Sequence, residues 1–245
     1  PAAIQGVGVL TRDAEDEYVV APTPASFREV ESTGQSARWS EDDDEDARRT
    51  LYYVAMKAGD YEQALEHAEA WQDRGLGSIL KPFALAWAHV GAGDSEAAQE
   101  ALATVAEDPN TGDFAASLSA AALWVAGDKA GALERYLQSV VEANRPVSIR
   151  HAQLALLAVG EAGTSEQQEA LVAALDSDLL RLPTFERLVE AMTAGEPLVY
   201  PITTPSQAAA EVLENIATSF SQDELGNEVA LGLAGAALFL QPENA

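Results

Sequence analysis

An acidic run at residues 41–46 has the residue types of a calcium site, because Asp42, Asp44 and Asp46 alternate as the ligands of a calcium-binding loop do. Such a loop also requires a glycine at its sixth position and a glutamate at its twelfth. In this register those two positions fall on Ala47 and Tyr53. The spacing therefore does not support a calcium site.

The same acidic run is better explained as the start of a helix. It follows Ser40, a residue type favoured at the N-cap, and Asp43 stands three residues later, where it completes a capping box. Carboxylates in the first turn of a helix are stabilised by the positive end of the helix dipole. We therefore expect a helix that begins near residue 41, with no specific ligand there.

Other residues with catalytic or metal-binding chemistry are scattered along the chain. The histidines His67, His89 and His151 include no pair three or four residues apart, so the sequence does not support a zinc site. The chain has no cysteine, which excludes disulfides, a thiol nucleophile and Cys-ligated metals. It also lacks a nucleophile-elbow, phosphate-loop or dinucleotide-binding motif. We predict no catalytic residue, metal or cofactor; a helical enzyme with a carboxylate pair is the catalytic alternative.

The charge of the chain limits its partners. Its 245 residues include 40 acidic and 14 basic ones, which gives a net charge of −26. This charge repels phosphate backbones and anionic membrane surfaces, so we expect no nucleic-acid partner. The longest apolar runs, such as Val229–Leu240, are shorter than the ~20 residues of a membrane span, which predicts a soluble protein without membrane insertion. Residues 1–10 carry no export signal, and the sequence leaves cytoplasmic and periplasmic or exported locations open.

A repeated dipeptide organises most of the chain. Ala-Gly recurs with its glycine at positions 59, 93, 127, 163 and 195, at intervals of 34, 34, 36 and 32 residues. Glycine just past the end of a helix accepts the left-handed conformation that terminates the helix. Each repeat is therefore predicted to be a helix, a tight turn and a second helix. Favoured N-cap residues follow the first four glycines: Asp60, Asp94, Asp128 and Thr164.

The second helix of each repeat has further signals. Gln63 and Gln167 stand where they complete capping boxes at the first and fourth turns. Ala64, Ala98 and Ala132 are 34 residues apart, four residues into the second helix. Their small size lets the two helices of a hairpin approach closely, whereas a larger side chain would separate them.

Period, turns and small residues together resemble the tetratricopeptide repeat family, whose repeat is 34 residues of paired antiparallel helices. The resemblance implies an all-α fold, a right-handed superhelical solenoid of antiparallel helix hairpins. The early tryptophan of the family is missing, and Ser95 and Lys129 stand where the first unit has Tyr61. The units that carry the resemblance are residues 45–78, 79–112, 113–146 and 211–244.

We predict two regions in the chain. Residues 1–40 form an irregular N-terminal segment or linker, because they show no helical period and contain Pro22 and Pro24. Residues 41–245 form the helical repeat domain, which includes a degenerate hairpin at residues 148–175 and a helix at Pro183–Ala194. A proline-rich interruption follows at residues 195–205. From Ile202-Thr-Thr-Pro205 to the final Ala-Leu-Phe-Leu-Gln-Pro, the chain is also similar to exported tetratricopeptide proteins of alphaproteobacteria.

Stacked hairpins of this kind line an inner face with the first helix of each repeat. Aromatic anchors dominate peptide interfaces because they bury a large area with little loss of rotamer freedom. We therefore predict a non-enzymatic scaffold or adaptor that binds a protein or an amphipathic peptide, and the family's lysine-and-asparagine clamp for terminal carboxylates is not expected. The resemblance places the binding positions at Arg49, Tyr53, Met56, Phe83, Trp87, Phe114, Ser117 and Trp124.

Three alternatives stay open for these positions and for the end of the chain. The aromatic side chains can be core between successive hairpins instead of ligand contacts. The segment Leu198–Ile202 can occupy the inner face as an internal ligand. The terminal hairpin, with Leu231, Leu233, Leu238 and Phe239, can stack on another copy, which would make the protein a self-assembly module and a homo-oligomer.

Overall fold

The structure is a computed structural model that describes residues 9–12, 18–21, 41–106, 112–142, 147–221 and 226–242. From Glu41 onward, the described residues form helices and their connections and include no strand. The predicted all-α fold is therefore confirmed for this part of the chain. None of the described helices combines the length and the apolar character of a membrane span.

Residues 1–40, for which we expected an irregular segment, include one regular element. Strands β1 (Val9–Arg12) and β2 (Tyr18–Ala21) pair antiparallel, with Val9 opposite Ala21 and Arg12 opposite Tyr18. Their β-branched and aromatic residues favour extended backbone. The predicted cap at Ser40 lies outside the described residues, as do the side chains of residues 41–44.

Three helical hairpins follow, each closed by a predicted Ala-Gly turn. The glycines at 59, 93 and 127 have φ of 76°, 84° and 90°, the left-handed conformation expected at a helix end. The next residue, Asp60, Asp94 or Asp128, accepts a hydrogen bond from the backbone N–H three residues on, at 3.2, 3.0 and 2.9 Å. The helices are α2 (Glu41–Ala58), α3 (Tyr61–Glu69), α4 (Leu76–Ala92), α5 (Ser95–Ala106), α6 (Gly112–Val125) and α7 (Lys129–Leu137), which the π-helix η1 (Gln138–Glu142) extends.

The fourth hairpin departs from this pattern at its glycine. Gly163 is extended, with φ −82° and ψ 161°, so the predicted left-handed turn is wrong at this position. A Cβ on Gly163 would lie 2.5 Å from the Val159 carbonyl oxygen, so the glycine allows a close approach instead. Thr164 and Gln167 form the predicted capping box. The two helices of this hairpin are α8 (Ile149–Ala162) and α9 (Ser165–Ala174). The short α10 (Ser177–Leu180) and α11 (Pro183–Ala194) follow them.

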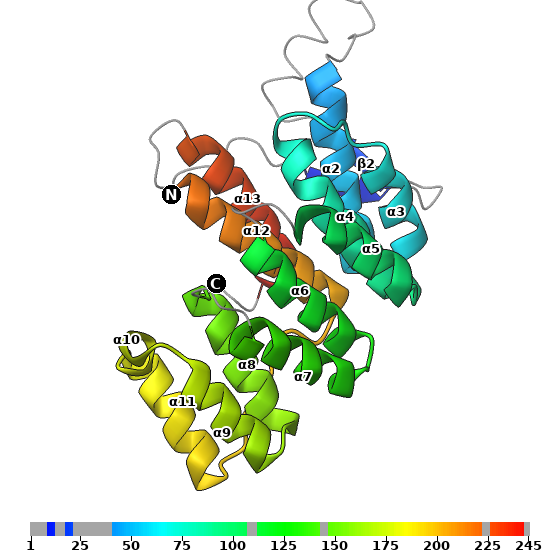
Figure 1. The fold of residues 1–245 in the computed structure, drawn as a ribbon. Helices are drawn as coiled ribbons and strands as arrows, with labels where there is room; N and C mark the ends of the chain where they lie inside the picture. The colour runs from blue at the N-terminus through cyan, green and yellow to red at the C-terminus, as the bar shows by residue number, and fades with distance from the viewer. Residues whose placement is uncertain are drawn as a thin grey trace, which may run out of the picture.

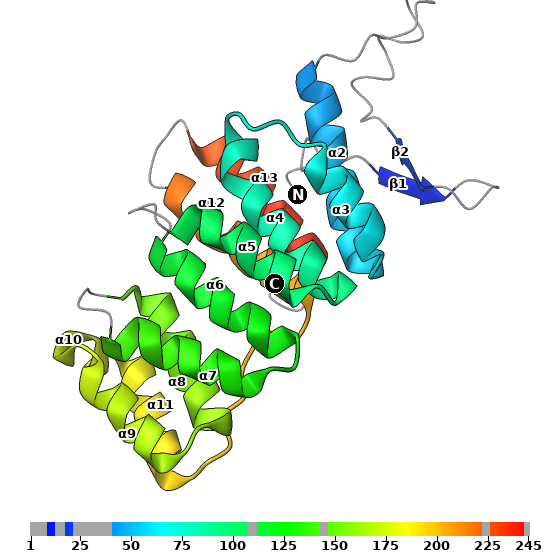
Figure 2. The same ribbon diagram turned by 45° about the vertical axis from the view of Figure 1, so that its right-hand side comes forward.

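After α11 the chain returns along the array. Residues 196–204 are not helical and lead to a last hairpin, α12 (Pro205–Phe220) and α13 (Asn227–Leu240). Helix α12 packs against α2, α4 and α6, the first helices of the three hairpins, and α13 packs against α12 and α2. Figure 1 shows this orange and red hairpin beside α4 and α6, and the turned view in Figure 2 shows it behind α4 and α5.

Packing inside the hairpins agrees with the small-residue pattern. Ala64, Ala98 and Ala132 are fully buried, as close contact between paired helices requires. Because the last hairpin lies on the first helices, the structure is a compact arrangement of helices, and the predicted superhelical solenoid is not confirmed.

Candidate functional site

The predicted binding positions lie on the first helices of the hairpins, and α12 covers their centre. We call this surface the inner face. Trp87 and Phe83 of α4 are 0% and 1% exposed, and they line a cavity of only about 10 Å³ with Tyr53. Three side chains of α12 close that cavity: Ala209, Val212 and Leu213. A partner would reach these aromatic rings only by displacing α12.

The ends of the inner face are occupied as well. Met56 is 1% exposed, and its carbonyl oxygen accepts a hydrogen bond of 2.8 Å from the Ser206 hydroxyl at the start of α12. Phe114 is half-buried against Phe83, with ring centroids 5.5 Å apart. These contacts agree with the alternative that the aromatic side chains form core.

Trp124 contacts the returning segment instead of α12. Its ring lies 4.6 Å from that of Tyr200, centroid to centroid, and Tyr200 is fully buried. The Tyr200 backbone N–H donates to Glu161 at 2.6 Å, and Glu161 also accepts from Lys129 at 2.8 Å. Residues 198–202 therefore lie against the inner face, as the internal-ligand alternative expects.

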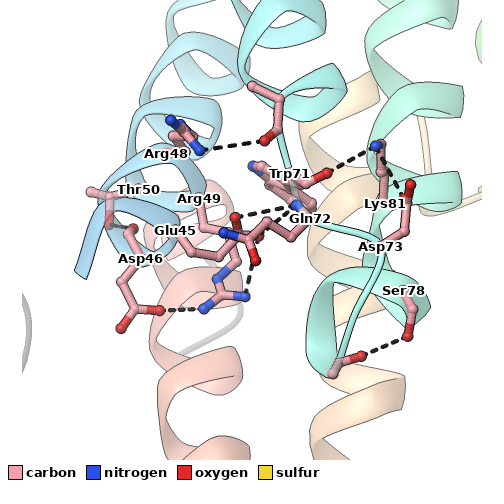
Figure 3. A network of polar contacts seen from close by, with 12 residues as sticks. Glu45, Asp46, Arg48, Arg49, Thr50, Trp71, Gln72, Asp73, Ser78 and Lys81 are labelled. Carbon is pink, nitrogen blue, oxygen red and sulfur yellow. Dashed lines mark hydrogen bonds and ion pairs between the residues drawn. The ribbon is translucent and has the colours of Figure 1, made fainter. Parts of the chain in front are cut away.

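Arg49 at the other end of the inner face is neutralised by two carboxylates. Its guanidinium donates to Asp46 and lies 3.8 Å from the Glu45 carboxylate (Figure 3). The side chain of Arg49 is 18% exposed. Burial raises the pKa of the neighbouring Tyr53 well above its usual value. Arg49 is thus committed to its own helix and offers little charge to a ligand.

The polar network in Figure 3 fixes the connection between α3 and α4. The backbone N–H of Gln72 donates to Glu45 of α2 at 3.2 Å, and the Lys81 amino group donates to the Trp71 carbonyl at 2.8 Å. Lys81 also pairs with Asp73 at 3.1 Å. These bonds hold the segment around Trp71 in place, and the Trp71 side chain packs in the core, where it is 2% exposed.

Ser117, the remaining predicted position, belongs to a row of hydrogen-bonded polar side chains between the helices, which we call the seam. It is 2% exposed and hydrogen-bonds the hydroxyl of Tyr136, which lies 2.6 Å from the hydroxyl of Tyr200. Burial raises the pKa of both tyrosines, so both are neutral donors and acceptors. The seam joins α6, α7 and the returning segment.

A partly buried ion pair continues the seam to α12. The Arg150 guanidinium of α8 donates two hydrogen bonds to the carboxylate of Glu211, both 2.5 Å long. Glu211 is 8% exposed, and the Arg150 side chain is 35% exposed. A bidentate ion pair of this kind fixes the relative orientation of the two side chains and neutralises their charges. It ties the last hairpin to the fourth.

The seam also contains a serine, a histidine and an aspartate in the order of a nucleophilic triad. The Ser139 hydroxyl lies 2.9 Å from His151 Nε2, and His151 Nδ1 lies 2.7 Å from the Asp113 carboxylate. Burial alone would raise the pKa of Asp113, but hydrogen bonds from His151 and Ser148 lower it to about 2. The distances match those that activate a serine.

Three features of this cluster argue for a structural role. The Ser139 hydroxyl donates to the Tyr136 carbonyl at 3.0 Å, so its proton is directed away from His151. His151 is 1% exposed, so its ring is packed inside the fold. Neither the cavity beside Trp87 nor the groove described next is lined by the three residues. The cluster links α6, η1 and α8.

A larger groove lies between α4 and α5. It has a volume of about 310 Å³ and is lined by Lys81 and Asp73, which pair with each other, and by Pro82. The hydroxyls of Ser78 and Thr104, which also line the groove, donate to the backbone carbonyls of Gly75 and Ala101. Among the residues that the structure describes, no three histidine, aspartate or glutamate side chains gather to hold a metal ion.

Comparisons of the chain with protein-family models, with curated proteins and with solved structures find no match. The resemblance to the tetratricopeptide family therefore rests on the residues of this chain alone.

Sequence reasoning missed the buried seam. Asp113, Ser139 and His151 were not connected by any motif, because the contacts that join them form only when α6, η1 and α8 pack. Arg150 and Glu211 are 61 residues apart, so no local pattern marks the pair.

Proposed function

We propose that this chain is a non-enzymatic scaffold that binds a protein or peptide partner, built from tetratricopeptide-like hairpins. The observation that supports the proposal is an exposed apolar face on α13. Leu231 and Leu238 are 74% and 43% exposed, and they lie seven residues apart, on one side of the helix. Glu228 is the only charged residue among residues 227–240. In a chain of net charge −26, such a face is a feature of a partner-binding surface.

The inner face is a poorer binding surface than α13. Burial of one valine or leucine side chain stabilises a fold by about 1.5–3 kcal/mol. Removing α12 would expose Val212, Leu213 and Ile216 together with Trp87, at a cost comparable to the 5–15 kcal/mol that stabilise a whole domain. We therefore place partner binding on α13 and assign the inner-face aromatic side chains to the core.

Affinity capture from lysate of the source organism tests the proposal. We expect a protein retained by the unchanged chain and lost from a variant with Leu231→Lys and Leu238→Lys. A control variant with Ile149→Lys and Val199→Lys makes the same charge change at exposed apolar residues on other elements, and it should retain the partner. Equal capture by all three proteins, with circular dichroism showing unchanged helix content, would refute the proposal.

Self-assembly is the second candidate, because the same exposed leucines can contact another copy. Sedimentation over a range of concentrations separates the two functions. A dimer that the α13 variant abolishes favours self-assembly, whereas a monomer that captures a partner favours the scaffold.

A further inference from the structure

Helix α13 differs from the second helices of the earlier hairpins on its solvent side. Ala230 is buried, as Ala64, Ala98 and Ala132 are, so the four helices can be compared position by position. Two residues after the alanine, the earlier helices carry an exposed glutamate: Glu66, Glu100 and Glu134. At this position α13 has an exposed glycine, Gly232.

Helix α13 also differs from the earlier helices at the position directly after the alanine. In the earlier hairpins it holds Leu65, Gln99 and Leu133; Leu133 is buried in the core, and Leu65 is half-buried against it. Gln99 donates to the Ser119 carbonyl of the following hairpin at 3.0 Å. In α13 this position holds Leu231, which is 74% exposed. The face that earlier hairpins turn toward a following helix is therefore continued on α13, where Leu231 is exposed.

Two glycines inside other helices of this molecule, Gly91 and Gly160, lie against bulky side chains. A Cβ on Gly91 of α4 would lie 2.2 Å from the ring of Tyr61, and one on Gly160 of α8 would lie 2.3 Å from Leu198. Both glycines act as sockets, because only the missing side chain lets the neighbour approach.

Helix α13 contains two glycines, Gly232 and Gly235, at which the space for a side chain is open. A Cβ on Gly232 or Gly235 would meet no heavy atom within 4 Å. Glycine inside a helix is unfavourable relative to alanine, so each of these two positions carries a small cost that a partner side chain packed against the glycine would offset. Gly235 lies between Leu231 and Leu238 on the open face.

We infer that the open face of α13 is a docking surface for an amphipathic helix of another protein, which inserts a bulky apolar side chain at Gly232 and Gly235 and carries basic flanks. The inference rests on the proposed scaffold function and names the chemistry of its partner. A helix fits because the face continues the helix-to-helix contacts of the earlier hairpins. Basic flanks fit because the chain is strongly acidic, and the same charge opposes the approach of a second copy.

The experiment uses two synthetic helical peptides of about 18 residues, a length at which a helix can form. Both carry an apolar stripe and lysines at the flanks, and they differ only in a central phenylalanine or alanine. Fluorescence anisotropy measures their binding to the full chain. We expect the phenylalanine peptide to bind about tenfold more tightly, the effect of one well-seated anchor.

The Gly232→Ala, Gly235→Ala variant fills the socket without touching another group, so its melting temperature should be unchanged or higher. It should also lose the preference for phenylalanine. Gly91→Ala is the matched control: it should lower the melting temperature, because the Tyr61 ring occupies its site, and any folded fraction should keep the preference.

Failure of the inference and failure of the scaffold proposal are distinguishable. The inference is overturned if the unchanged chain shows no preference for the phenylalanine peptide. It is also overturned if this preference survives in the Gly232→Ala, Gly235→Ala variant. If the Leu231→Lys, Leu238→Lys variant still loses its captured partner, the scaffold proposal stands. Dimerisation through α13 in sedimentation experiments would overturn the inference in favour of a second copy.

Discussion

Asp113 connects three elements through one carboxylate. It accepts hydrogen bonds from His151 of α8 and from the backbone N–H of Ser148, which precedes that helix, while it sits in the first turn of α6. Through His151 the contact reaches Ser139 of η1. A single side chain thus holds the third and fourth hairpins together.

We expect Asp113→Asn to destabilise the chain at neutral pH and to have a clearly smaller effect in acid. The pKa of Asp113 in the folded protein is about 2, below its usual value of 3.8, so the carboxylate stabilises the fold above pH ~4 and this contribution decreases as the pH falls through about 2. Because the group is partly exposed, we expect roughly 1–2 kcal/mol at pH 7. Urea unfolding of both proteins at pH 7 and 2.5 measures the difference. A difference that is equal at both pH values would contradict the ionic role.

Sequence reasoning was effective at residues whose partners are local. The caps Asp60, Asp94 and Asp128 bond the backbone three residues away, so the spacing alone located them. Gly163 shows the limit, because its backbone is set by the approach of Val159 and not by the Ala-Gly signal.

At the scale of elements, the last hairpin is held by polar contacts as well as by apolar ones. Arg150 and Glu211 join α8 to α12, and the Lys57 amino group of α2 donates to the Phe239 carbonyl and lies 4.2 Å from its ring centroid. The bounds of α11 and α12 follow from local proline signals, Pro183 and Pro205 at their first positions. The packing partners of these two helices do not follow from local signals, because helical periodicity identifies an apolar face but not the element that covers it.

The ion pair gives a test of how α12 is seated. Glu211→Leu should cost about 2–4 kcal/mol, because it leaves the Arg150 guanidinium half-buried without its counter-charge. The double variant Arg150→Met, Glu211→Leu should recover most of that loss, since two apolar groups replace the pair. Chemical denaturation in a double-mutant cycle measures the coupling. A loss below about 0.5 kcal/mol for Glu211→Leu would mean that α12 is not held at this contact.

At the scale of the whole molecule, the chain closes its own inner face. The hairpins were predicted from the repeat and the interruption from its prolines, but their assembly depends on where residues 196–221 and 226–242 return. Trp87 shows the consequence: the same aromatic residue that marks a binding surface in an open array is core once α12 covers it. The surface that we propose for partner binding therefore lies on the outside of α13.

Hydrogen–deuterium exchange on the unchanged chain tests this closure most directly. Amides in cooperatively packed helices exchange slowly, whereas those in a detached segment exchange quickly. If α12 is core, its amides around Val212 should be protected as strongly as those of α4 around Trp87. Exchange of α12 within seconds, beside a protected α4, would contradict the closed inner face and restore the aromatic groove as the binding surface.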